Sequence, residues 1–108
     1  MPKSFHQEMA TIPARVQRGM NVLDKMGVCD WRERIDLQRL DISRADVCIL
    51  GQLYGYFSSA PDQLVHTSAL STKCGFNVPS HLKWRDEECD RYCETLTGEW
   101  KNALSSAA

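Results

Sequence analysis

Residues 31–57 of the chain read WRERIDLQRLDISRADVCILGQLYGYF, and this stretch decides the fold class. The apolar residues of its second half recur with the period of one helix face: Leu50, Leu53, Tyr54 and Phe57. Ser43 and Asp46 stand just before this run with the three-residue spacing of a capping pair. The pattern therefore predicts a core helix over residues 44–54.

The segments before the central helix carry similar but shorter signals. Asp30 and Glu33 have the spacing of a capping pair and predict a helix entry, followed by an irregular connection over residues 36–42. Further upstream, an apolar stripe of helical period ends at Gly27, a residue type that often follows the last turn of a helix. This stripe predicts a helix over residues 12–26.

Two more helices are predicted after the central one. Pro61 suits a first helical position and begins a helix that ends near residue 73. Ser80 is the expected N-cap of a last helix, whose apolar stripe extends to Leu104. Gly98 lies within this stripe, and the pattern leaves open whether the helix is bent, split or continuous there.

The length of 108 residues, with 43% hydrophobic and 25% charged residues, is that of one small domain. We expect an all-α bundle of four to five helices over residues 11–104. Residues 1–10 are expected to form a flexible leader and residues 105–108 a flexible tail. The residues expected at the centre of the core are Leu23, Ile35, Leu50, Leu53, Leu96 and Trp100.

Charge, hydropathy and cysteine content argue against several classes of function. The formal net charge is -1, which gives no overall field that would recruit nucleic acid or anionic lipid. No apolar run approaches the ~20 residues that cross a membrane, and residues 1–6 lack the apolar segment of a signal peptide. The five cysteines are an odd number, so reduced thiols and a cytoplasmic location are expected.

Two cysteines of the last predicted helix are the metal-binding candidates. Cys89 and Cys93 are one turn apart and would hold zinc, with His66, His81 or Cys74 completing the ligands. Both thiols also lie on the apolar stripe, where free cysteine packs as a small hydrophobe, and no CxxC knuckle accompanies them. No metal and no cofactor are therefore expected, and a zinc-stabilised domain remains an alternative.

No catalytic constellation is visible in the sequence. Cys48 has no histidine near it in sequence that would activate it as a nucleophile. The three histidines are scattered and show no catalytic spacing. We therefore expect that the protein is not an enzyme.

Aromatic and basic residues supply the partner-binding candidates. Trp84 falls about 200° around the last helix from Leu82, at ~100° per residue, so its ring either anchors a partner or packs beneath residues 76–79. The binding set is completed by Trp31, Arg32, Arg34 and Arg39. Arginines beside an aromatic ring also bind phosphate and stack on bases, so residues 32–44 support a nucleic-acid alternative. The interleaved acids favour a solvated surface instead.

Four short patterns occur in a fixed order: RGMxxLD at residues 18–24, WRERIDLxRLDI at 31–42, CxLGQLYG at 48–55 and GF at 75–76. In this order and spacing they resemble an uncharacterised family of short proteins of actinobacteria and their phages. The resemblance covers about residues 15–76 and implies an actinobacterial or phage origin. By analogy with other small phage proteins, it also implies binding to a host protein.

We therefore expect a small cytoplasmic protein-binding module without catalytic activity, and the resemblance implies a phage-encoded modulator of a host factor. The expected partner is a host protein or a second copy of the chain, and neither nucleic acid nor membrane is expected. The apolar surface of the central helix leaves monomer and homodimer open. A nucleic-acid-associated domain and a zinc-stabilised domain remain the alternatives.

Overall fold

The computed structural model describes residues 3–106, which are mostly helical and contain no strand. Its α-helices are α1 (Phe5–Ala10), α2 (Ile12–Lys25), α3 (Trp31–Arg34), α4 (Ile49–Tyr54), α5 (Asp62–Val65), α6 (Ser68–Lys73) and α7 (Asp86–Ser106). Two short 3-10 helices complete the order: η1 (Phe57–Ser59) and η2 (Ser80–Leu82). The predicted all-α fold is confirmed. The described residues form seven α-helices rather than four to five, because α1 was not predicted and the helix predicted from Pro61 is divided in two.

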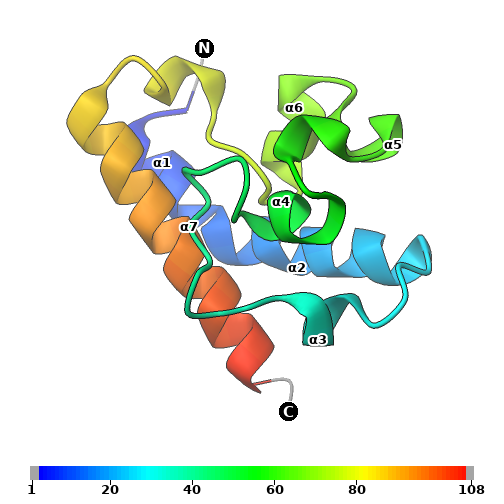
Figure 1. Ribbon diagram of the computed structural model, residues 1–108. Helices are drawn as coiled ribbons and strands as arrows, with labels where there is room; N and C mark the ends of the chain where they lie inside the picture. Colours follow the sequence, from blue (N-terminus) through cyan, green and yellow to red (C-terminus); the bar gives the residue numbers. More distant parts are fainter. Residues whose placement is uncertain (1–2, 107–108) are drawn as a thin grey trace.

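The two longest helices, α2 and α7, cross and pack against each other (Figure 1). The helix predicted over residues 12–26 is confirmed as α2. Gly19 lies where α2 meets its neighbours. A β-carbon at Gly19 would lie 2.9 Å from the Trp100 ring and would overlap the carbonyl oxygen of Cys74. The missing side chain therefore allows α2 to approach both α7 and the end of α6.

Trp100 of α7 is the centre of the core. Its buried ring stacks on Phe76 with 5.7 Å between centroids and meets Trp31 edge-on at 6.4 Å. Its indole N–H donates to the carbonyl oxygen of Gly75 over 2.7 Å, so the polar atom of the ring has a partner. The residues predicted at the centre of the core are all buried: Leu23, Ile35, Leu50, Leu53, Leu96 and Trp100.

The flexible leader predicted over residues 1–10 is wrong for its described part, because helix α1 occupies most of it. Ser4 begins α1 with a capping box: its hydroxyl accepts from the Gln7 amide, and the Gln7 side chain accepts from the Ser4 amide. Glu8 is buried, which shows that α1 is docked on the core. Periodicity missed this helix because six residues are too few to repeat a stripe.

The helix predicted over residues 44–54 is wrong in its first half. Only α4 is helical, and the expected capping pair lies in turns. The N-cap is Cys48, whose sulfur accepts a hydrogen bond from the Gly51 amide at 3.3 Å. A β-carbon at Gly51 would overlap the carbonyl oxygen of Ala45, so the preceding turn folds back into the space that glycine leaves.

The irregular connection predicted over residues 36–42 is confirmed, and it continues to residue 48. We call residues 36–48 the 36–48 loop. The Gln52 side chain fastens this loop to α4: it accepts from the Asp36 amide at 2.6 Å and donates to the carbonyl oxygens of Asp36 at 3.1 Å and Val47 at 2.9 Å. The Gln52 side chain thus makes hydrogen bonds to the loop backbone that a helix or sheet would otherwise supply.

Two predicted helix starts differ in detail from the structure. The helix entry near Asp30 is confirmed as α3, but Asp30 adopts a left-handed φ of 52° and its side chain makes no capping hydrogen bond. The helix predicted from Pro61 to about residue 73 is divided into α5 and α6. The division falls at Thr67, whose extended backbone and hydroxyl cap the second part.

The last helix begins at Asp86 rather than after Ser80. Residues 80–82 form η2 instead, and three acidic residues occupy the first turn of α7, where the helix dipole favours negative charge. The helix is continuous through Gly98 and extends into the predicted flexible tail. Residues 1–2 and 107–108 of the predicted leader and tail lie outside the described residues.

Candidate functional site

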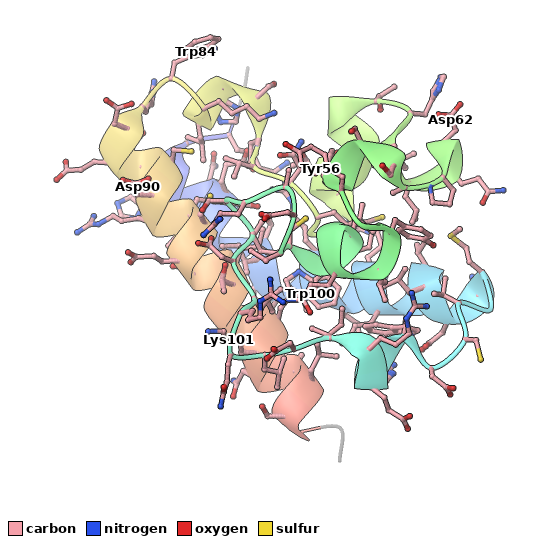
Figure 2. The ribbon with its side chains drawn as sticks, in the orientation of Figure 1. Tyr56, Asp62, Trp84, Asp90, Trp100 and Lys101 are labelled. Carbon is pink, nitrogen blue, oxygen red and sulfur yellow. The ribbon has the colours of Figure 1, made fainter. Side chains whose placement is uncertain are left out.

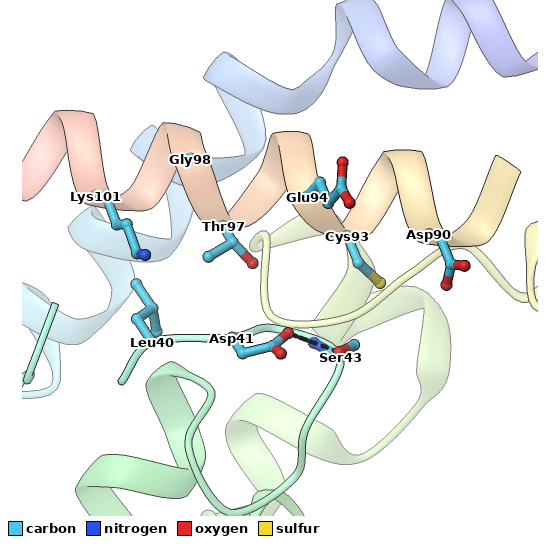
Figure 3. A pocket seen from close by; sticks show the side chains of 9 residues that line it. All are labelled: Leu40, Asp41, Ser43, Asp90, Cys93, Glu94, Thr97, Gly98 and Lys101. Carbon is cyan, nitrogen blue, oxygen red and sulfur yellow. Dashed lines mark hydrogen bonds between the residues drawn. The ribbon is translucent and has the colours of Figure 1, made fainter. Parts of the chain in front are cut away.

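A groove of about 450 Å³ lies between the 36–48 loop and α7 (Figure 3). We call it the α7 groove. Leu40 and Cys93 line it and are buried. Gly98 also lines it, and a β-carbon placed there would meet no atom within 4 Å. The volume lies within the range of ~300–1,000 Å³ that is usual for ligand sites.

Acidic side chains dominate the rim of the α7 groove. Asp41, Asp90 and Glu94 contribute three negative charges, and Lys101 contributes one positive charge. The Asp41 carboxylate accepts from the amide and the hydroxyl of Ser43 at 2.9 Å and 2.6 Å, which fixes that wall of the groove. The net charge of this rim is therefore -2, which favours a cationic occupant.

The loop wall is also tied directly to the helix wall. The Ile42 amide donates to the hydroxyl oxygen of Thr97 over 3.0 Å. Ile42 itself is buried in the core. The two walls of the groove come from distant parts of the sequence and are held at a defined separation.

The two cysteines of α7 differ in exposure: Cys93 is buried and Cys89 is partly buried. Burial, together with the neighbouring Cys89 thiol, raises the pKa of the Cys93 thiol to about 12. A thiol held in this way is a poor nucleophile and a poor metal ligand near neutral pH. Among residues 3–106, no three His, Cys, Asp or Glu side chains lie close enough together to hold a metal ion. The zinc alternative therefore lacks a third ligand within this part of the chain.

Trp84 lies in the connection between η2 and α7, and its side chain projects away from the body of the protein (Figure 2). The residue is 89% exposed. The alternative that the Trp84 ring packs beneath residues 76–79 is therefore wrong. Phe76 and Val78 are buried without a contribution from that ring. Lys83 and Arg85 flank Trp84 on both sides, and both are exposed.

The other predicted binding residues are mostly engaged within the protein. Trp31 is buried in the core, which removes its ring from any surface. Arg32 lies over that ring and pairs with Asp24 at 2.9 Å. Arg34 donates to the carbonyl oxygen of Leu53 over 2.8 Å, and Arg39 is exposed. Arg34 and Arg39 line one small pocket together with Asp36 and Asp46, so carboxylates are interleaved with the basic side chains on this surface.

A buried polar cluster was not expected from the sequence. Arg15 donates to the Tyr92 hydroxyl over 2.7 Å and to the Glu8 carboxylate over 3.0 Å. The second oxygen of Glu8 lies 3.4 Å from the His81 ring. Burial raises the pKa of the Tyr92 hydroxyl, and the Arg15 guanidinium partly opposes this shift. The cluster joins α1, α2, η2 and α7, and its side chains are satisfied by one another.

The exposed Trp84 lies two residues before α7 begins, and the α7 groove extends along that helix. None of the helices in residues 3–106 is long and apolar enough to cross a membrane. Comparisons of the chain with protein-family models, with curated proteins and with solved structures find no match.

Proposed function

We propose that this protein is a non-enzymatic protein-binding module with Trp84 as the anchor of its interface. The observation that carries the proposal is the 89% exposure of this indole beside a core that is complete without it. Burying a tryptophan removes about 150–250 Å² from water, which stabilises a complex by roughly 4–6 kcal/mol before the costs of association. Tryptophan is accordingly enriched among the residues that dominate interface energies.

The charges around Trp84 are of both signs. Lys83 and Arg85 flank the indole, and Asp86, Glu87 and Glu88 follow them in the first turn of α7. A matching surface therefore offers an apolar pocket for the ring, with a rim that pairs charges of both signs. The resemblance of residues 15–76 to actinobacteriophage proteins supports the extension that the module is a phage-encoded modulator of a host factor.

The test compares three versions of the tagged protein in quantitative capture from actinobacterial lysate. Trp84→Ala is the test variant. Tyr56→Ala is the matched control, because Tyr56 is the other exposed large aromatic residue, at 53%. We expect the wild type and the control to capture the same protein. Trp84→Ala should bind that protein with about 30-fold lower affinity, which corresponds to a loss of ~2 kcal/mol of binding free energy. Thermal melting should be unchanged in both variants.

Two outcomes would count against the proposal. If all three versions capture the same proteins in the same amounts, Trp84 does not anchor an interface. If Trp84→Ala melts at a lower temperature than the control, the Trp84 ring stabilises the fold and is not free to anchor a partner.

A further inference from the structure

We infer that the contact between His81 and Glu8 is a pH-sensitive switch, which holds helix α1 more firmly on the body of the protein as the pH falls below neutral. The switch joins α1 to η2 and acts independently of the proposed role of Trp84. Its parts are a histidine ring that meets two acceptors of the N-terminal segment, and a carboxylate that is buried where it meets the ring.

The His81 ring reaches both acceptors through one nitrogen. Its Nε2 lies 3.0 Å from the carbonyl oxygen of Lys3 and 3.4 Å from Oε2 of Glu8. Since a carbonyl oxygen and a carboxylate only accept, Nε2 carries a hydrogen in the neutral ring, and Nδ1 gains the second proton. The ring therefore becomes charged without losing either contact. The side chains of Lys3 and Lys83, which lie nearby in sequence or contact, are exposed.

The groups that face His81 from the other packed helices are of both signs. The Glu8 carboxylate is buried, and its second oxygen pairs with Arg15 of α2 at 3.0 Å. Arg15 also donates to the Tyr92 hydroxyl of α7, which stays uncharged near neutral pH because burial raises its pKa. Lys73 of α6 lines a small hollow together with His81 and is exposed. The charge in contact with His81 is therefore the negative one.

A proton on His81 turns this contact into an ion pair that exists only while α1 is docked. Histidine gains its charge between about pH 8 and pH 5, where carboxylates remain ionised. Arg15 opposes the new charge in part, from the other oxygen of Glu8. Because the docked state binds the proton more tightly than the undocked state, docking of α1 strengthens as the pH falls through this range. The gain ends near about pH 4, where carboxylates become protonated.

The experiment measures hydrogen exchange of the α1 backbone amides from Glu8 to Ala10 at about pH 7.5 and about pH 5.5. Exchange rates are corrected for the intrinsic effect of pH and compared with those of α2 amides in the same sample. This comparison removes any change in the stability of the whole protein. We expect the opening of α1 relative to α2 to be about fivefold rarer at the lower pH, as for a partly exposed ion pair.

His81→Gln is the test variant, because its side-chain amide donates to the same acceptors and does not titrate. In this variant we expect the relative opening of α1 to be the same at both pH values and close to that of the wild type at about pH 7.5. His6→Gln and His66→Gln are the matched controls, since both of these histidines are exposed. Both controls should keep the wild-type response to pH.

The other outcomes overturn the switch. If the wild type shows the same relative opening of α1 at both pH values, protonation does not strengthen the docking of this helix. If the response to pH persists in His81→Gln, or disappears in His6→Gln or His66→Gln, another group is responsible. The proposed function is judged separately by lysate capture with the Trp84 variant, which leaves His81 and α1 unchanged.

Discussion

At the scale of single residues, two helix glycines predict opposite results for the same substitution. Gly19→Ala places a β-carbon against the Cys74 carbonyl oxygen and the Trp100 ring, and we expect this overpacking to destabilise the protein by about 1–3 kcal/mol. Gly98→Ala meets no neighbour and should stabilise the protein by up to ~1 kcal/mol. Urea denaturation measures both changes. Midpoints that move in the same direction would contradict this account of the two positions.

A second residue-scale prediction concerns the buried ion pair of Glu8 and Arg15. Glu8→Ala leaves the guanidinium buried without its carboxylate and should cost about 3–5 kcal/mol. Glu88→Ala is the matched control, because it removes an ion pair of the same length from a more exposed site and should cost at most ~1 kcal/mol. Thermal unfolding compares them. Similar losses in the two variants would mean that burial does not set the strength of the Glu8 pair.

At the scale of elements, the junction of α2 and α3 predicts a dependence on acid. The indole N–H of Trp31 donates to the Asp24 carboxylate over 2.9 Å and holds its pKa below the usual value, with a further contribution from Arg32. Since the folded-state pKa is lowered, this stabilisation is present above about pH 4 and is lost as the pH falls through the folded value. Half of the Asp24 side chain is exposed, so solvent weakens the effect.

The check is a pH series of urea midpoints for the wild type and Asp24→Asn. We expect the wild type to be more stable at neutral pH and the difference to shrink below about pH 4. A difference that stays constant across the series would show that the carboxylate charge is not responsible.

The elements also show where sequence patterns succeed. The stripe of α2 is long and regular, so its helix was predicted to within one residue at its end. The pair formed by Ser43 and Asp46 was misread, because three-residue spacing also occurs in turns, and here Ser43 donates to the carboxylate of Asp41. Helix α1 was missed by periodicity, although Ser4 and Gln7 carry the capping-box signal that would have found it.

At the scale of the whole molecule, burial sorts the thiols by reactivity. Burial raises the pKa of Cys48, Cys74 and Cys93, whereas Cys29 is exposed and Cys89 is partly exposed. Because the thiolate is the reactive form, iodoacetamide at about pH 8 should modify Cys29 first and Cys89 next. The three buried thiols should react only as the protein unfolds. Mass spectrometry over time measures this order, and five adducts appearing at one rate would contradict it.

The candidate site was only half predictable from sequence. Trp84 was singled out because it falls off the apolar stripe of the predicted last helix, but α7 begins only at Asp86, so the exposure of Trp84 comes from its place in the connection before the helix. The α7 groove was not found, because its walls come from Asp41 and Ser43 on one side and residues 90–101 on the other. No local pattern records that these segments meet. The cluster around Arg15 was missed for the same reason, since Tyr92 lies far along the chain.

The hydrogen bonds that Gln52 makes to the 36–48 loop have a consequence for local opening of the protein. A single amide holds the Asp36 end and the Val47 end of the loop, so one rotation of that side chain releases both ends together. Opening of this kind melts no helix, and amide hydrogens of the loop should exchange with solvent well before those of α2 and α7. The loop is also one wall of the α7 groove, where the hydrogen bond from the Ile42 amide to the Thr97 hydroxyl still ties it to α7 when Gln52 lets go.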